Sequence, residues 1–102
     1  MIKHIILWKL KEGFSKDEKQ KIKEDIKTNL ESLKGKIDGL AEIKVQIDSL
    51  DIPASNADVM LYSSFVNQTA YEGYIVHKDH VAVADNYVRP YTEIRLCMDY
   101  ED

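Results

Sequence analysis

Hydrophobic and polar residues alternate along four segments of the chain, residues 2–11, 41–48, 58–66 and 93–100. A period of two residues is typical of β-strands, because successive side chains point to opposite faces of a sheet. Residues 2–11 and 58–66 are apolar on both sides in their middle, whereas residues 41–48 are apolar on one side only. The pattern therefore predicts four strands, of which two need cover on both faces.

Two other segments carry apolar residues at helical spacing. Ser15 and Glu18 have the spacing of a capping box, in which each side chain bonds the backbone N–H of the other residue. Asn67 is a suitable cap for a second helix, which we expect to be interrupted near Lys78-Asp79 and to end before Pro90. The apolar stripe of the first helix consists of Ile22, Ile26, Leu30, Leu33 and Ile37.

The order of the predicted elements is β-α-β-β-α-β, the ferredoxin-like arrangement of a four-stranded antiparallel sheet with both helices on one face. A chain of 102 residues can bury one core, so residues 1–102 are expected to form a single domain. The uncovered sheet face would expose a larger apolar patch than monomers usually show. We therefore expect a homodimer that packs face to face into an α+β barrel, with Ile6 in the interface.

The second half of the chain is acidic: residues 51–102 carry three basic side chains against nine acidic ones, within a net charge of −4. This balance argues against binding of nucleic acid, which needs clustered Lys and Arg. The apolar run of residues 5–8 is too short for a membrane span or a signal peptide, so we expect no membrane partner and a cytoplasmic location. The single cysteine, Cys97, is expected to be a small core residue.

Residues 71–80 contain two tyrosines and two of the three histidines of the chain, Tyr71, Tyr74, His77 and His80. Histidine titrates near neutral pH and acts as a base there without a large pKa shift. His77 and His80 are three residues apart, but no second cluster of ligands accompanies them, so we expect a hydrogen-bonded pair and no metal. The sequence has no glycine-rich phosphate loop, and no cofactor is expected.

Short motifs extend over nearly the whole chain in a characteristic order. They are Lys3-His4, Asp58, Ser64-Phe65, Ala70-Tyr71, Tyr74 followed by His77-x-x-His80, and Asp99-Tyr100-Glu101. Each motif is weak by itself, and the ordered set is fairly specific. In these residues the chain resembles the stress-responsive α/β-barrel (Dabb) domain family.

The resemblance implies a homodimeric barrel in which each subunit keeps a cleft between its sheet and its helices. Some relatives are polyketide cyclases that use the second histidine of the His-x-x-His element as general base and the preceding tyrosine to hold the substrate. By position these catalytic roles fall on His80 and Tyr74, and His4 lines the same cleft. The substrate-binding candidates are His4, His77, Trp8 and Tyr71.

Two positions depart from the pattern of the family. Lys78 stands where the family often has proline after the first histidine. Ile26 stands where the plant cyclases have a tyrosine in the first helix, which argues against the same cyclisation reaction.

Three functions remain open for such a chain. The first is binding of a small hydrophobic, aromatic or polyketide-like molecule with cofactor-free acid–base chemistry, a cyclase-, isomerase- or lyase-like activity that uses His80 as the base. The second is a non-catalytic carrier with the same cleft. The third is a stress-associated structural or assembly protein. A cleft lined by His4, Tyr74 and His80 favours the first two functions, and a fully packed interior favours the third.

Overall fold

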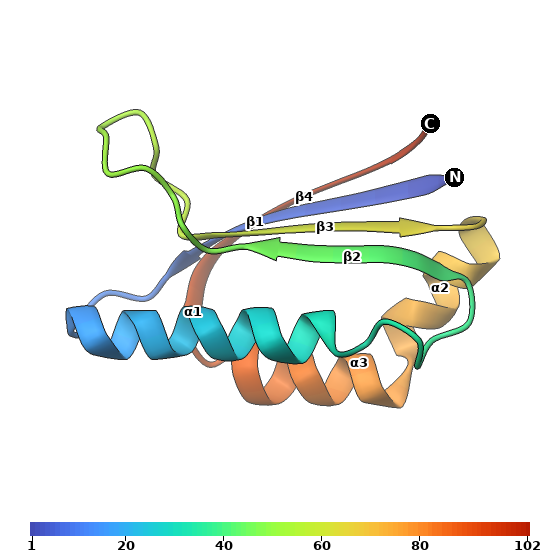
Figure 1. Cartoon of the computed structure of the whole chain (residues 1–102), viewed down its shortest axis with the longest axis horizontal. Coiled ribbons are helices and arrows are strands. Elements are labelled where there is room, and N and C mark those ends of the chain that lie inside the picture. The colour runs from blue at the N-terminus through green and yellow to red at the C-terminus, as the bar shows by residue number, and fades with distance from the viewer.

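One antiparallel sheet organises the chain, with its strands in the order β2-β3-β1-β4. The computed structural model describes all residues, 1–102 (Figure 1). None of its helices combines the length and the hydrophobicity that crossing a membrane requires. Along the chain the elements are β1 (Ile2–Leu10), α1 (Lys16–Glu31), β2 (Leu40–Gln46), β3 (Val59–Phe65), α2 (Gln68–Val76), α3 (Lys78–Val83), a π-helical turn η1 (Ala84–Val88) and β4 (Thr92–Glu101).

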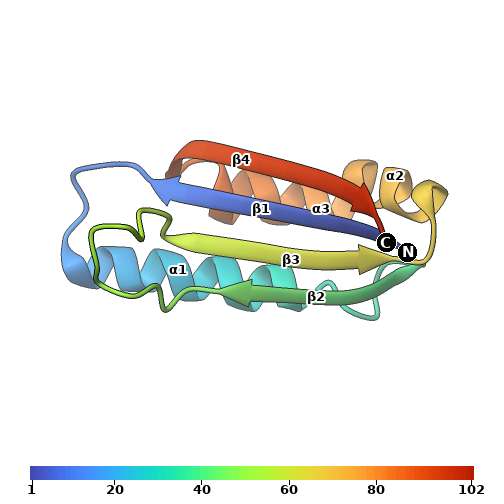
Figure 2. The same cartoon turned by 90° about the horizontal axis from the view of Figure 1, so that it is seen from above.

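All helices lie on one face of the sheet, and the opposite face is open (Figures 1 and 2). The two strands that are apolar on both sides, β1 and β3, occupy the centre of the sheet and pair antiparallel with both neighbours. The predicted ferredoxin-like fold with a four-stranded antiparallel sheet is confirmed.

The first helix begins where its capping box predicts. The Ser15 hydroxyl accepts from the Glu18 N–H at 3.1 Å, and the Glu18 carboxylate accepts from the Ser15 N–H at 2.9 Å. The helix ends at Glu31, earlier than predicted, because the backbone changes there to tighter turns with hydrogen bonds between residues three apart. Leu33 and Ile37 are buried as expected, but they lie in these turns and not on the helix.

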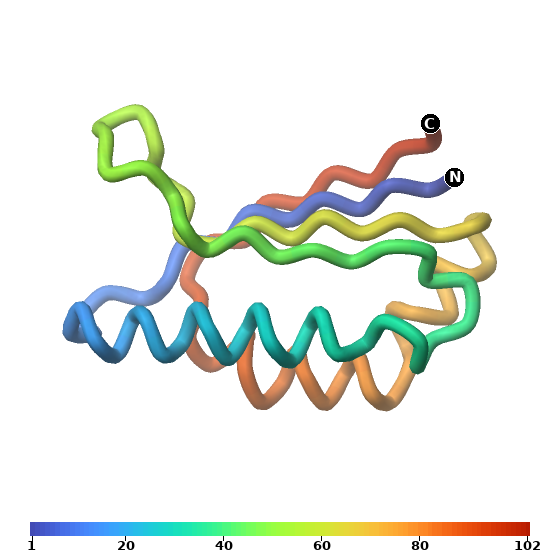
Figure 3. The backbone as a smooth tube through the Cα atoms, in the orientation of Figure 1, coloured from blue at the N-terminus to red at the C-terminus, as the bar shows by residue number.

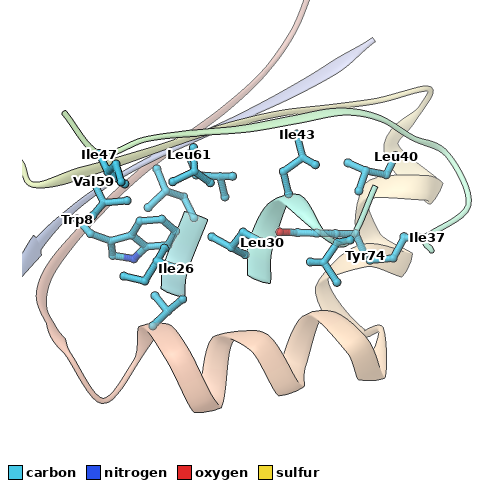
Figure 4. Close-up of a cluster of buried hydrophobic side chains, with 14 of the residues drawn as sticks. Trp8, Ile26, Leu30, Ile37, Leu40, Ile43, Ile47, Val59, Leu61 and Tyr74 are labelled. Carbon is cyan, nitrogen blue, oxygen red and sulfur yellow. The ribbon is translucent and has the colours of Figure 1, made fainter. Parts of the chain in front are cut away.

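The hydrophobic core fills the space between the sheet and the helices (Figure 4). Trp8 from β1 and Leu61 from β3 lie there together with Ile26 from α1, and all three are buried. Tyr74 extends from α2 into this interior, with its hydroxyl pointing inward (Figure 4). The core is therefore built on one side of the sheet only, and the helical layer determines which strand residues belong to it.

The open face of the sheet is apolar over β1 and β4. In the antiparallel pairing of these strands, Leu7 lies opposite Leu96 and Ile5 opposite Met98. Ile6 points to the other side and is 4% exposed within the core, so its predicted place in a dimer interface is wrong. Alternation separates the two faces of a strand, but it does not tell which face the helices cover. The large exposed apolar side chains of the open face are Leu7, Ile94, Leu96, Met98 and Tyr100.

The second helical segment is interrupted at His77, one residue before the predicted break. His77 has a ψ of 132°, ends α2 and begins α3, and its Nδ1 accepts from the Asp79 N–H at 3.1 Å. Beyond α3 the helix widens into η1, where the Arg89 N–H donates to the Ala84 carbonyl at 2.8 Å. This π-type hydrogen bond holds Arg89 in the helical region even though Pro90 follows it.

Gly39 allows the start of β2 to approach the first turn of α2 closely. Its φ is +81°, and a Cβ at this position would lie 2.4 Å from the Cβ of Ala70. Gly35 has a similar φ of +85°, but a Cβ there would meet nothing within 4 Å. Since α2 carries Tyr71 and Tyr74, the close approach at Gly39 also sets the position of these two side chains.

We expect Gly39→Ala to destabilise the protein by about 2–5 kcal/mol, because the left-handed backbone costs about 1–2 kcal/mol and the clash with α2 adds a further 1–3 kcal/mol. Gly35→Ala is the matched control and should lose only the backbone contribution. Urea unfolding of both variants measures the difference. Equal losses at the two positions would contradict the close approach at Gly39.

Candidate functional site

A cavity of about 210 Å³ lies between the sheet and the helices, toward the β4 edge. Residues from β1, α2, α3, η1 and β4 surround it. The first strand, the last strand and the second helical segment therefore all contribute to its walls. The lining residues are His4, Ile6, Trp8, Tyr71, Tyr74, Ile75, His80, Ala84, Val88, Arg89, Thr92 and Arg95.

A hydrogen-bonded group of His4, Asp99 and Tyr71 adjoins the cavity, and His4 and Tyr71 belong to its lining. The pairing of β1 with β4 places His4 opposite Asp99. His4 Nδ1 lies 2.5 Å from Asp99 Oδ1, and the Tyr71 hydroxyl donates to Asp99 Oδ2 at 2.7 Å. The same hydroxyl lies 3.1 Å from His4 Nδ1. Both carboxylate oxygens are therefore occupied, and the carboxylate fixes the orientation of the His4 ring.

The protonation states of this group follow from its geometry. Desolvation tends to raise the pKa of Asp99, but hydrogen bonds from His4 and Tyr71 outweigh it and lower this pKa. Burial lowers the pKa of His4, against the opposing effect of the Asp99 carboxylate. A neutral His4 ring then carries its proton on Nδ1, which donates to the ionised Asp99, and its Nε2 keeps a free lone pair.

His80 has the same tautomer for a different reason. Its Nδ1 lies 3.2 Å from the carbonyl oxygen of Ile75, which can only accept, so Nδ1 carries the proton. Burial is the largest cause that lowers the pKa of His80, and the charge of Arg89 acts in the same direction. At neutral pH the ring is therefore uncharged, with a basic Nε2.

Tyr74 lies beside His80, and its hydroxyl is buried without a hydrogen-bond partner. The two rings are 4.0 Å apart between centroids, and the Tyr74 ring also meets the His4 ring edge-on at 6.2 Å. Tyr74 is 1% exposed, and burial raises its pKa, so the hydroxyl stays protonated. A buried donor without a partner costs free energy of folding, which native proteins mostly avoid outside functional sites.

Five of the six site residues predicted from the sequence line this one cavity: His4, Trp8, Tyr71, Tyr74 and His80. His77 does not. Its Nδ1 is used to cap α3, and its side chain borders a separate surface hollow of about 610 Å³ near Gly39 and Asn67. In this structure His77 shapes the chain beside the cavity and lies outside it.

Three charged residues of the site were not predicted from the sequence: Asp99, Arg89 and Arg95. Asp99 and Arg95 come into place through the pairing of β4 with β1, which joins opposite ends of the chain. For the two arginines the amino-acid composition offered a signal, because Arg89 and Arg95 are the only arginines in the sequence. Arg89 forms an ion pair with Asp85, whereas Arg95 has no carboxylate partner.

Cys97 was predicted to be a core residue, but it is exposed because β4 is an edge strand. Its Sγ lies 3.6 Å from His4 Nδ1 and 3.5 Å from Asp99 Oδ1. These three atoms are close enough to be considered as metal ligands. However, two ligands with bonds of about 2.0 Å to a tetrahedral zinc stand roughly 3.3 Å apart. The 2.5 Å contact between His4 and Asp99 is that of a strong hydrogen bond.

We expect Tyr74→Phe to stabilise the protein by about 1 kcal/mol, since it removes a buried hydroxyl that has no partner. Tyr71→Phe is the matched control and should destabilise by about 1 kcal/mol, because it removes a hydrogen bond to a carboxylate. Urea unfolding at neutral pH distinguishes the two signs. A loss of stability in Tyr74→Phe would mean that its hydroxyl is satisfied within the fold.

The chain matches the sequence model of a protein family and several solved structures. The family is the Stress responsive A/B Barrel Domain, Dabb, and the match covers residues 2–102. A dimeric protein of unknown function with a ferredoxin-like fold from Bacteroides fragilis is 32% identical, with a TM-score of 0.88 over 99% of this chain and 95% of that one. No curated protein matches the chain.

Two further structures extend the comparison. A Dabb family protein from Mesorhizobium loti is 26% identical, with a TM-score of 0.75 over 99% of this chain and 95% of that chain. The hydroxynitrile lyase of Passiflora edulis is 18% identical, with a TM-score of 0.77 over 97% of this chain and 90% of that chain, and shares the fold. From the match over residues 2–102, the chain belongs to the stress responsive A/B barrel (Dabb) domain family.

Proposed function

We propose that the protein is a homodimer in which each subunit binds a small aromatic molecule in the cavity and acts on it by cofactor-independent acid–base chemistry. The observation that carries this proposal is Tyr74, whose buried hydroxyl has no hydrogen-bond partner and whose ring lies against the uncharged ring of His80. A ligand oxygen is the partner that this donor lacks, and a neutral imidazole next to it is a base.

The chemistry that these two groups can perform is proton abstraction next to a carbonyl. His80 Nε2 accepts a proton from the carbon atom, and the electron pair of the broken C–H bond moves into an enolate. The Tyr74 hydroxyl donates to the enolate oxygen, in a site largely closed to water where such a bond is strong. Return of the proton to the same or another carbon completes an exchange or an isomerisation.

The size and lining of the cavity support a ligand with a single aromatic ring. An apolar cavity of about 150 Å³ accommodates a benzene molecule, so a cavity of about 210 Å³ leaves room for one ring and a small substituent. Ile6, Trp8 and Val88 supply apolar wall. An extended polyketide chain fits this volume less well. The hydroxynitrile lyase of Passiflora edulis indicates that this fold can carry lyase chemistry.

The test substrate is phenylacetone, a one-ring ketone whose methylene protons exchange with solvent deuterium through the enolate. We expect the protein to accelerate this exchange, measured by proton NMR in D₂O. The rate should be constant around neutral pH and fall in acid, below the lowered pKa of His80, because a protonated imidazole cannot accept a proton.

Two substitutions test the assignment of roles. His80→Asn should abolish the acceleration, and Tyr74→Phe should reduce it about 100-fold, in the range of lost oxyanion donors, while both variants stay folded. His77→Asn is the control for a histidine outside the cavity and should keep at least a large part of the rate. Full activity in His80→Asn would reject the proposed base, and binding of phenylacetone without exchange would favour the carrier function.

The open face of the sheet and the similar structures support the homodimer. The Bacteroides fragilis protein, 32% identical, is described as dimeric. The loop between β2 and β3 rises on the side of the open face (Figure 3) and carries exposed Leu50 and Ile52. A second copy packed on this face would cover both the strands and the loop.

We expect Leu96→Asp to dissociate the dimer, because it places a charge in the middle of the apolar open face. Val76→Asp is the matched control, since Val76 is equally apolar and 76% exposed but lies on α2. Sedimentation equilibrium should give a dimer for the parent chain and for Val76→Asp, and a folded monomer for Leu96→Asp. A parent chain that stays monomeric at high micromolar concentration would exclude the face-to-face barrel.

A further inference from the structure

The only two arginines of the chain both line the cavity, although residues 51–102 contain nine acidic residues. Arg89 forms an ion pair with Asp85, four residues earlier in the chain. Arg95 forms no ion pair. Asp99, which lies on the same strand, is already bonded to His4 and Tyr71. Arg95 therefore brings a positive charge to the cavity that the fold itself does not neutralise.

Arg95 stands on the wall of the cavity that β4 forms. It lies on β4 opposite Trp8 of β1, four residues before Asp99. Four residues of a strand span about 13 Å along the backbone, and the long Arg95 side chain bridges part of this distance, since its charge acts on His4, Tyr71 and Cys97. Arg95 is exposed, which places it at the mouth of the cavity, whereas His4 and Tyr74 are buried inside.

The charge of Arg95 is felt within the cavity. It acts to lower the pKa of His4, Tyr71 and Tyr74, and in each case burial is the larger effect. The charge thus opposes protonation of His4 and favours any negative charge that a bound molecule carries or develops. A planar guanidinium binds a carboxylate through two parallel hydrogen bonds, which makes it more selective for this group than an ammonium ion.

We propose that the ligand is a small aromatic carboxylic acid whose carboxylate is bound by Arg95, whose ring packs against Trp8, and whose far end reaches Tyr74 and His80. This inference rests on the proposed function for the location of the site, and it adds the chemical class of the ligand. One unpaired cation matches one negative charge, because the other arginine of the lining, Arg89, is already paired with Asp85.

The probe pair is benzoate and benzamide, which have nearly the same shape and differ in charge. Trp8 is the only tryptophan and lines the cavity, so its fluorescence reports occupancy directly. We expect benzoate to change the Trp8 emission with an affinity at least 10-fold higher than that of benzamide. Arg95→Gln should remove this preference, and Arg95→Lys should restore only part of it.

Arg89→Gln is the matched control, because it removes the other arginine of the cavity, the one already paired with Asp85. It should keep the preference for benzoate. Equal affinities of the parent chain for benzoate and benzamide would overturn the inference, as would a preference that survives in Arg95→Gln. A Trp8 emission that neither compound changes at millimolar concentration would also overturn it.

The two proposals fail in different ways. Exchange of the phenylacetone protons for solvent deuterium without selectivity for benzoate would leave the acid–base function standing and reject the role of Arg95. Benzoate binding that depends on Arg95, without any exchange reaction, would leave the ligand class standing and reject the catalytic role of His80.

Discussion

At His77 the backbone leaves the helical region, with a ψ of 132°, and the geometry of the cavity depends on this turn. Tyr74 and His80 are six residues apart, and a continuous helix with about 100° per residue would place them on different faces. Because the chain turns between them, their rings lie 4.0 Å apart. The side chain of His77 holds the turn in place by capping α3 through the Asp79 N–H. His77 thus contributes to the site through the path of the backbone.

The polar groups at the cavity differ in whether the fold satisfies their hydrogen bonds. His4, Asp99 and Tyr71 satisfy one another, so that a buried histidine and a carboxylate are held without loss of stability. Tyr74 is as deeply buried as His4, but its hydroxyl has no partner. A protein selected only for stability would carry phenylalanine at this position. Side chains that satisfy one another and a donor that the fold leaves unsatisfied therefore lie close together.

Local patterns in the sequence predicted the elements of the fold but not the sides on which they pack. The capping box at Ser15 and the cap at Asn67 act within a few residues, and both lie where they were expected. The alternation along β1 identified two faces, yet the choice between Ile6 and Leu7 depends on where the helices pack, which is a property of the whole chain.

The candidate site was predictable to the extent that it is local in sequence. Residues 71–80 supply Tyr71, Tyr74 and His80, and their grouping pointed to the cavity. Asp99 and Arg95 enter through the pairing of the first strand with the last, about 90 residues away, where neither spacing nor composition specifies the register. Sequence reasoning therefore found the histidine and tyrosines of one helical segment and missed the charged residues that the strand pairing brings beside them.

Strand β4 contributes to both the proposed dimer interface and the proposed ligand site, because its alternate residues point to opposite faces of the sheet. Leu96 and Met98 lie on the open face, while Arg95 and Asp99 point to the cavity side with Trp8 and His4. In a single subunit β4 is an edge strand, hydrogen-bonded on one side only. A second copy packed on the open face would restrict the motion of β4 and, with it, the positions of the Arg95 cation and the Asp99 carboxylate. The proposed assembly and the proposed ligand site would then be coupled through the two faces of one strand.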